Sequence, residues 1–204
     1  MAELEAVIFD IGNVFVEWDP RNLYVNHFDD LKAMEHFLSH ITTPAWNLEQ
    51  DRGRLFADAV KMLSDEHPDF ADKIQMFHSN WIQMLGAEIS GTVEILNTLQ
   101  SDGVPVYAIT NFSAETWPIF CSRHAFTERF VDIIVSGHEK IIKPDAEIFE
   151  LAIKRFGLVP ERSIFIDDSL ANVRGAEALK IKGHHFTDAL SLEADLKSRG
   201  LLGG

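Results

Sequence analysis

Acidic side chains stand where two apolar segments of this chain end. Asp10 follows the β-branched and aromatic run from Ala6 to Phe9, and the pair Asp167-Asp168 follows the run SIFI. Neighbouring carboxylates raise one another's pKa, so a pair that faces a third acid is costly without a cation. This trio of acids therefore predicts a metal site.

Three further groups have similar positions but different chemistry. Thr110 and Asn111 close the apolar run PVYAIT, and Lys143 precedes a helical pattern that follows another apolar run. The formal net charge of the chain is −14, so a site for a phosphate or carboxylate needs a local positive charge of this kind. Whether these groups meet the acids depends on the elements that position them.

Short apolar runs alternate with helical patterns through the second half of the chain. The expected strands are 6–9, 105–110, 132–136, 163–166 and 184–187, and the expected helices are 91–102, 116–126, 145–156 and 171–179. This alternation predicts an α/β fold with a Rossmann-like, doubly wound parallel sheet. Ligands bind beyond the carboxyl ends of the strands in such a sheet, so the polar groups are expected to converge on one edge.

Residues 20–88 interrupt that alternation. Aromatic residues, Met, Leu and His lie among charged residues at helical spacing, and no strand pattern is evident there. The expected helices are roughly 20–28, 30–41, 50–65 and 70–86. The sequence therefore predicts a core domain made of 1–18 and 89–204, with a helical cap domain at 19–88 inserted after the first strand.

Four short motifs in this order resemble the haloacid dehalogenase superfamily of hydrolases. They are FDIGNV with Asp10, ITN with Thr110, KPD with Lys143, and IDDSLANVRGA with Asp167 and Asp168. Each motif alone has an ordinary explanation: Asp10 suits a helix N-cap, and Thr110-Asn111 suits a turn. All four together, each at a strand end or a helix start, would require several independent coincidences.

The resemblance implies a role for each motif residue. Asp10 would be a nucleophile that forms a covalent aspartyl intermediate, and Lys143 would be a fixed positive charge beside the transferring group. Thr110 and Asn111 would bind the substrate's phosphoryl oxygens. A Mg²⁺ ion would be held by oxygen ligands from Asp10, the Gly12 carbonyl, Asp167 and Asp168.

The chain departs from the family pattern at Gly12. Most phosphatases of the family have a second Asp at this position, which protonates the leaving alcohol. A phosphatase without it needs a substrate with a good leaving group, such as a sugar 1-phosphate, or an acid from elsewhere. The candidates near the cap are Glu17, Asp19, Glu49 and Asp51.

Two other functions fit a glycine at position 12. A 2-haloacid dehalogenase releases halide and needs no acid, and a binding or regulatory domain with weak catalysis needs none either. Dehalogenases of the family work without metal and lack the acidic pair, whereas this chain keeps Asp167-Asp168. They also use an arginine early in the cap, and after Arg21 the next arginine is Arg52. The acid pair favours the Mg²⁺-dependent phosphatase, acting on a small phosphorylated molecule such as a sugar phosphate.

Composition limits the other possibilities. The acidic net charge disfavours nucleic acid and anionic lipid as partners, and no apolar run has the length of a membrane span. The single cysteine, Cys121, excludes an internal disulfide, so a cytoplasmic location is expected. His36 and His40 share a helix face without a third zinc ligand, and Trp46 is a weak candidate for the substrate pocket. The sequence does not indicate an oligomeric state.

Overall fold

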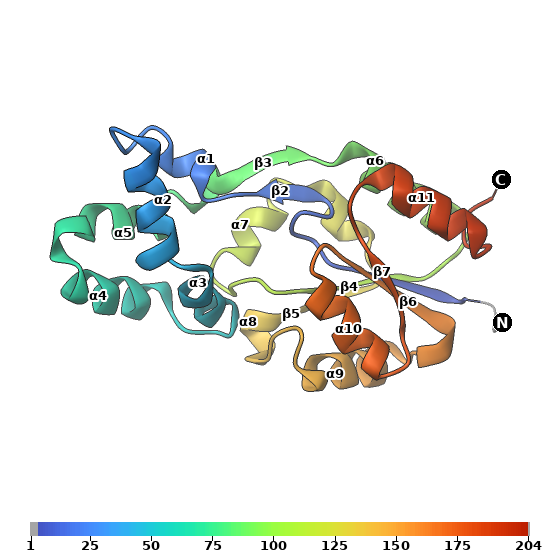
Figure 1. The fold of residues 1–204 in the computed structure, drawn as a ribbon. Helices are drawn as coiled ribbons and strands as arrows, with labels where there is room; N and C mark the ends of the chain where they lie inside the picture. The colour runs from blue at the N-terminus through green and yellow to red at the C-terminus, as the bar shows by residue number, and fades with distance from the viewer. Residues whose placement is uncertain (1–3, 204) are drawn as a thin grey trace.

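A parallel sheet forms the centre of the computed structural model, which describes residues 4–203 (Figure 1). The sheet has five strands in the order β5-β4-β1-β6-β7, and all neighbouring pairs are parallel. The strands are β1 Ala6–Phe9, β4 Val106–Thr110, β5 Asp132–Val135, β6 Ser163–Asp167 and β7 Lys182–His185. The predicted α/β fold is confirmed.

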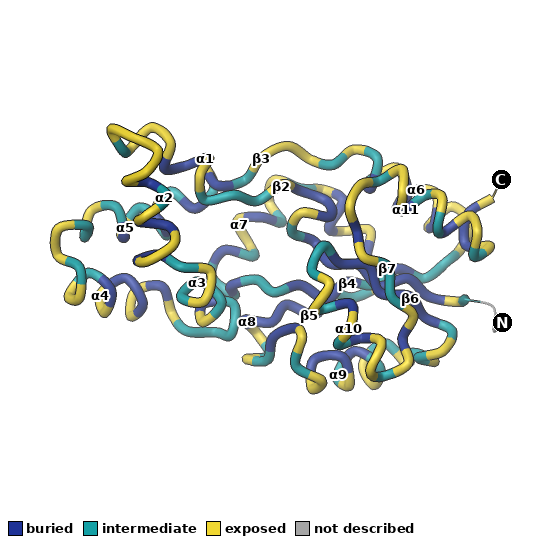
Figure 2. The backbone as a smooth tube through the Cα atoms, viewed as in Figure 1, coloured by how far each residue is buried: buried dark blue, intermediate teal, exposed yellow. Residues whose placement is uncertain are grey.

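Helices cover both faces of this sheet. They are α6 Ser90–Ser101, α7 Trp117–Cys121 and α11 Ala189–Ser198 on one side, and α8 Ser136–Glu139, α9 Ala146–Phe156 and α10 Leu170–Ala178 on the other (Figure 1). Successive residues of a strand point to opposite faces. Val7 and Phe9 therefore pack in the core cluster that includes α6 and α11, while Ile8 packs in the cluster that includes α9 and α10. The central strands are buried along their length (Figure 2).

Two elements of the second half differ from the sequence prediction. The expected helix 116–126 ends at Cys121, and a 3-10 helix, Ala125–Arg129, follows. Phe120 and Phe126 are six residues apart and would point about 120° apart around one helix, yet both are buried in the same cluster. The break allows this shared packing. The last strand lies two residues earlier than expected, because Lys182–His185 are the residues that pair with β6. Asp188 caps α11 by accepting a hydrogen bond from the Ser191 N–H at 2.8 Å.

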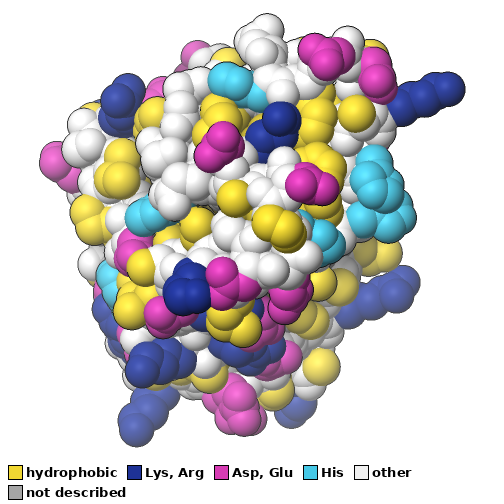
Figure 3. Space-filling view, turned by 90° about the vertical axis from the view of Figure 1, so that its left-hand side faces the viewer, with side chains coloured by type: hydrophobic (Ala, Val, Ile, Leu, Met, Phe, Trp, Pro, Cys, Tyr) yellow, Lys and Arg dark blue, Asp and Glu magenta, His cyan; other side chains and the backbone are white. Residues whose placement is uncertain are grey.

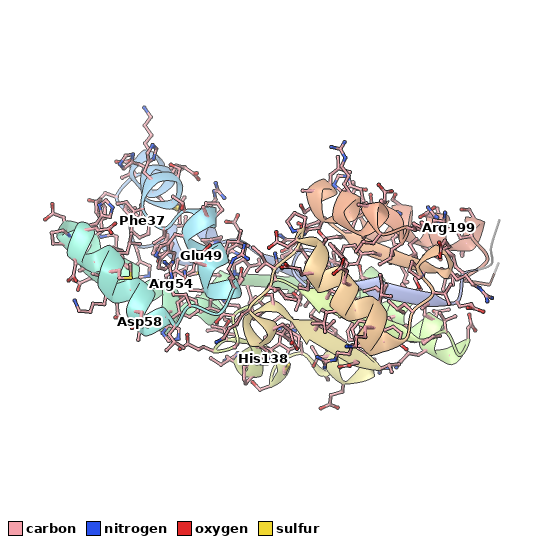
Figure 4. All side chains as sticks on the ribbon, turned by 90° about the horizontal axis from the view of Figure 1, so that it is seen from below. Phe37, Glu49, Arg54, Asp58, His138 and Arg199 are labelled. Carbon is pink, nitrogen blue, oxygen red and sulfur yellow. The ribbon has the colours of Figure 1, made fainter. Side chains whose placement is uncertain are left out.

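A helical insertion extends from one end of the sheet, opposite the chain termini (Figure 1). It contains α1 Arg21–Tyr24, α2 Leu31–His40, α3 Pro44–Asp51, α4 Phe56–Glu66 and α5 Ala71–Ser79. Figure 4 shows Phe37, Glu49, Arg54 and Asp58 within this insertion. Aromatic rings hold it together: Tyr24 and Phe37 have centroids 5.0 Å apart, and Trp46 meets Phe77 edge-on at 5.0 Å.

The insertion helices are shorter than expected. The expected helix 50–65 is wrong, because α3 ends at Asp51 and α4 begins at Phe56. Gly53 has a φ of +101° in the connection, a conformation that ends helices and favours glycine. The expected helix 70–86 ends at Ser79 and is followed by a 3-10 helix, Trp81–Met84, and a strand. The expected helix 20–28 is reduced to α1.

A two-stranded antiparallel sheet connects the insertion to the core. It pairs β2 Val16–Trp18 with β3 Leu85–Glu88, and the sequence analysis did not predict it. β3 has the sequence LGAE with mostly exposed residues, so it lacks the alternation that marks a half-buried strand. Its partner strand, far away in the sequence, determines its conformation. No helix in the described part of the chain is long and apolar enough to cross a membrane.

Candidate active site

Three carboxylates meet at the carboxyl edge of the sheet. Oxygens of Asp10, Asp167 and Asp168 all lie within 4.8 Å of one another. The pairing of β1 with β6 explains this, since Phe9 lies opposite Ile166 and the Asp10 N–H donates to the Ile166 carbonyl at 2.8 Å. The strand ends thus bring together the acids that the sequence singled out.

Lys143 lies between two of these acids. Its Nζ is 2.7 Å from Asp10 Oδ1 and 2.6 Å from Asp167 Oδ2, and the lysine is only 1% exposed. Burial lowers the pKa of Lys143, but the two carboxylates outweigh burial and raise it overall. The ammonium group is therefore a fixed positive charge in the position that its motif implied.

Asn111 holds the backbone of Lys143 in place. Its Nδ2 donates to the Lys143 carbonyl at 3.0 Å, and its Oδ1 accepts from the Lys143 N–H at 2.8 Å. Asn111 also lines the cavity above Asp10. The sequence assigned Asn111 to substrate binding, and the hydrogen bonds add a positioning role that the motif ITN did not reveal.

Asn172 is a site residue that the sequence analysis missed. Its Nδ2 lies 3.0 Å and 3.1 Å from the two carboxylate oxygens of Asp167. The Ser169 N–H donates to the same carboxylate at 2.8 Å. Asp167 is fully buried, so these donors and Lys143 satisfy a charge that water does not reach. Asn172 lies inside the motif IDDSLANVRGA. Its position one helical turn after Ser169 was the signal that could have identified it as a site residue.

The site carries an excess of negative charge. Burial raises the pKa of Asp10 to about 7, and the charges of Asp167 and Asp168 add to this although Lys143 opposes it. Burial and Asp167 also raise the pKa of Asp168, whereas a hydrogen bond from Asn13 lowers it. A divalent cation beside these oxygens would offset the repulsion, and carboxylate oxygens are the ligands that Mg²⁺ prefers. The residues present therefore fit a magnesium ion.

Thr110 offers a hydroxyl without a partner. Its side chain is 1% exposed, and its Oγ1 has no hydrogen-bond partner among residues 4–203. Buried hydroxyls are nearly always hydrogen-bonded. A free donor at the end of β4, beside the strand that positions Asp10, fits the binding of a phosphoryl oxygen.

A cavity of about 180 Å³ opens above these groups. Its lining includes Asp10, Gly12, Asp51, Asn111 and Asp168. A Cβ atom added at Gly12 would meet no other atom within 4 Å. Space therefore does not require glycine at this position.

Asp51 is the insertion acid that reaches this cavity. Of the four candidates from the sequence, it alone belongs to the cavity lining. Burial raises its pKa to about 7, and the negative charge of Asp10 adds to the rise. Its backbone carbonyl accepts a hydrogen bond from Ser136 Oγ at 2.6 Å, and Asn47 Nδ2 lies 3.3 Å from its Oδ2. These contacts fix the end of α3 over the sheet edge.

The other three acids have different surroundings. Glu17 packs against Gly86 in the β2–β3 sheet, and Asp19 pairs with Arg21 at 3.2 Å. Glu49 is 3.9 Å from Arg52, and Figure 4 shows it on α3 within the insertion. None of the three lines the cavity above Asp10.

Two weaker candidates from the sequence lie elsewhere. Trp46 packs against Phe77 and does not line this cavity, although its neighbour Asn47 does. The His36 and His40 rings stack with centroids 4.4 Å apart. In the part of the chain that the structure describes, the acid trio is the one group with the composition and spacing of a metal site.

Comparison with known proteins agrees with this geometry. The model of the haloacid dehalogenase-like hydrolases matches residues 4–180. The chain belongs to this family. It is therefore a hydrolase of this superfamily, and the suspected resemblance is confirmed.

Relatives of this hydrolase include phosphatases. A protein named sesquiterpene phosphatase from Aspergillus oryzae is 27% identical and aligns over 95% of both chains. A protein named phosphorylated carbohydrates phosphatase from Thermotoga maritima is 22% identical over 88% of this chain and 83% of its own. These names differ in the organic part of the substrate.

Solved structures share the fold of this hydrolase. A HAD family enzyme from Bacteroides thetaiotaomicron, in complex with magnesium and inorganic phosphate, matches with a TM-score of 0.68 and 21% identity, covering 91% of this chain and 95% of that one. A structure described as a dehalogenase matches with a TM-score of 0.65 and 16% identity, covering 90% and 84%. The fold alone therefore does not distinguish the two chemistries.

Proposed function

We propose that this protein is a Mg²⁺-dependent phosphatase that hydrolyses a small phosphate monoester through an aspartyl-phosphate on Asp10. The observation that supports this most directly is the contact of buried Lys143 with both Asp10 and Asp167, beside Asp168 and below the cavity. A nucleophilic carboxylate can approach a phosphate dianion only where positive charge offsets their repulsion. The names of both relatives agree with this reaction.

The metal ligands in this proposal are Asp10, the Gly12 carbonyl, Asp167 and Asp168. Bound Mg²⁺ would supply positive charge to the phosphoryl oxygens and to the nucleophile. Asn172 and the Ser169 N–H hold Asp167 in a single orientation. The remaining steps use side chains of the chain itself.

In the first step, an Asp10 oxygen bonds to phosphorus while the bond from phosphorus to the alcohol oxygen breaks. Lys143 and the Thr110 hydroxyl stabilise charge on the phosphoryl oxygens, and Asn111 keeps Lys143 in position. In the second step, water attacks the phosphorus of the aspartyl-phosphate. This step releases inorganic phosphate and restores the Asp10 carboxylate.

Asp51 is the proposed source of the proton that Gly12 cannot supply. It lines the same cavity as Asp10, and its raised pKa of about 7 keeps a proton available near neutral pH. It would donate this proton to the leaving alcohol oxygen and later accept a proton from the attacking water. The insertion 19–88 would then be a cap that completes the catalytic site over a core of 1–18 and 89–204.

Dehalogenation is the second candidate function, because the fold and Gly12 fit both reactions. The acid trio disfavours it, since a halide substrate needs no metal site.

The names of the two relatives point to different organic parts of the phosphate ester. A sugar phosphate agrees with one name and a terpenoid phosphate with the other.

A direct assay tests the proposal. Hydrolysis of p-nitrophenyl phosphate is measured with Mg²⁺ and with a chelator, for the wild type and for Asp10→Asn. We expect chelation to abolish turnover and Asp10→Asn to lower kcat by about 10³-fold or more, because the nucleophile is lost. Metal-independent release of chloride from 2-chloropropionate, or unchanged turnover in Asp10→Asn, would refute the proposed mechanism.

A further inference from the structure

The cavity above Asp10 is lined by apolar residues as well as by its catalytic groups. Five aromatic residues, called the aromatic wall below, line it together with Val16 and Leu85. The aromatic wall consists of Trp18, Phe56, Trp81, Phe112 and Phe120. Core and insertion both contribute to it, so it forms only when the chain is folded.

Three rings of this wall contact one another, and Phe56 instead stacks on His78 with centroids 4.5 Å apart. Trp81 meets Phe112 edge-on with centroids 5.3 Å apart, and Phe112 lies 5.2 Å from Phe120. Phe56 and Phe120 are each 1% exposed. Rings packed in this way present a fixed apolar surface to whatever occupies the cavity.

The chemistry of the wall discriminates between alcohols. Apart from two indole N–H groups, its side chains contain no hydrogen-bonding atom, and the polar lining residues Asn13, Asn47, Ser113 and Thr116 lie outside the wall. Sugar hydroxyls placed against the wall would lose water without gaining partners, which is unfavourable. An alkyl or alkenyl chain, in contrast, gains from every methylene that leaves water.

We infer that the substrate of the proposed phosphatase is the phosphate monoester of an apolar alcohol, with its phosphate at Asp10 and its hydrocarbon part against the aromatic wall. This inference rests on the proposed function for the position of the phosphate. It narrows the substrate class that the sequence left open and disfavours a sugar phosphate.

A second hollow adjoins the cavity. It has a volume of about 390 Å³ and shares Asn13, Trp18 and Asn47 with the first cavity. Its lining combines an ion pair, in which Arg21 is bound to Glu35 at 2.6 Å, with the apolar residues Pro20, Leu38, Pro44 and Phe77. An apolar group should therefore gain affinity with length until it has filled the apolar lining of both hollows.

Binding of n-alkylphosphonates in the presence of Mg²⁺ tests the inference without turnover, because phosphonates have no ester bond to cleave. The quenching of tryptophan fluorescence reports binding, since Trp18 and Trp81 line the cavity. We expect Kd to fall about fourfold for each added methylene and then to level off. A Kd independent of chain length, or a polyol phosphonate that binds as tightly as butylphosphonate, would overturn the inference.

A pair of variants tests where in the cavity the hydrocarbon part of the ligand binds. Leu85 lines the cavity, whereas Ile82 is half-buried nearby and does not. Leu85→Gln should weaken hexylphosphonate binding by about tenfold and leave methylphosphonate unchanged, because a polar group replaces apolar lining. Ile82→Gln should change neither. Equal effects of both variants, or equal effects on both ligands, would contradict the assigned position of the hydrocarbon part.

The outcomes separate this inference from the proposed function. If p-nitrophenyl phosphate turnover depends on Asp10 but phosphonate affinity ignores chain length, the phosphatase stands and the apolar substrate is wrong. If affinity rises with chain length but turnover does not depend on Asp10, the apolar cavity stands and the phosphatase mechanism is wrong.

Discussion

In the proposed mechanism, Asp10 and Asp51 divide the work that two neighbouring aspartates perform in most phosphatases of this family, and Gly12 occupies the position of the second aspartate. Open space around Gly12 shows that steric crowding does not exclude a side chain there. Asp51 lines the same cavity, with a pKa raised to about 7 by burial. The proposed acid therefore comes from the insertion and reaches the substrate only when α3 is in place.

Replacing Asp51 with Asn tests this division. Alkyl phosphates leave as poor leaving groups and need a proton, so we expect Asp51→Asn to lower their kcat by about 10²-fold. p-Nitrophenol leaves without protonation, so its phosphate should lose no more than about threefold. Steady-state kinetics on both substrates measures the difference, and Glu49→Gln on the same helix is the matched control.

The pH profile is a second readout of the same variant. Asp51 with a pKa near 7 donates a proton below that pH and loses it above. Because bound Mg²⁺ would keep its proposed ligand Asp10 ionised, the kcat/KM for alkyl phosphates at saturating Mg²⁺ should fall as the pH rises through about 7, and Asp51→Asn should remove this fall. An equal loss on both substrates with an unchanged pH profile would show that Asp51 has only a structural role.

At the scale of elements, the connection between α3 and α4 joins the insertion to the core. Ser136 binds the Asp51 carbonyl, and the Phe56 N–H donates to Glu115 Oε2 at 2.7 Å. Gly53 lies between them, where an added Cβ would come within 3.1 Å of the Gly137 carbonyl oxygen. This close approach and the positive φ of Gly53 require a glycine.

Gly53→Ala should disturb this connection. A non-glycine residue with positive φ costs about 1–2 kcal/mol, which corresponds to a fall in Tm of about 2–8 °C for a chain of this size. Because the clash also displaces Asp51, kcat for alkyl phosphates should fall as well. Gly157→Ala is the control: its φ is +64°, but its Cβ would meet nothing within 4 Å, so only stability should fall. Unchanged kcat in Gly53→Ala would show that the connection does not position Asp51.

At the scale of the whole molecule, the acidic net charge of −14 contrasts with the positive charge buried at the site. Lys and Arg side chains lie among Asp and Glu side chains on the face of the insertion (Figure 3). Inside the site, the buried Lys143 ammonium offsets part of the negative charge of the acids. The three carboxylates carry more negative charge than this single cation can neutralise.

Magnesium should consequently stabilise the folded protein. A ligand at 100 times its Kd adds about 2.7 kcal/mol to the free energy of unfolding, so Tm should rise by about 5–10 °C. Asp168→Asn should remove most of this rise because it deletes a proposed ligand. Asp102→Asn, an exposed substitution at the end of α6, should keep it. Thermal unfolding with and without Mg²⁺ measures both, and an equal rise in the two variants would exclude Asp168 as a ligand.

The sequence by itself determined the sheet and the residues at its edge. The short apolar run of β1, which is buried along its length, and the order of strands and helices follow from local sequence patterns. Carboxyl ends of parallel strands meet at one edge, so the positions of Asp10, Thr110 and Asp167 followed once the strands were identified. The motif order also placed the chain in its family.

Only the tertiary structure decided what surrounds these residues. Of the four candidate acids it placed only Asp51 in the cavity lining, and it formed the β2–β3 sheet and assembled an aromatic wall from residues between Trp18 and Phe120. These features depend on contacts between segments far apart in the chain, and local periodicity contains no information about such contacts. The chemistry at the sheet edge was therefore readable from sequence, whereas the proposed choice of proton donor and substrate depends on how the insertion packs over it.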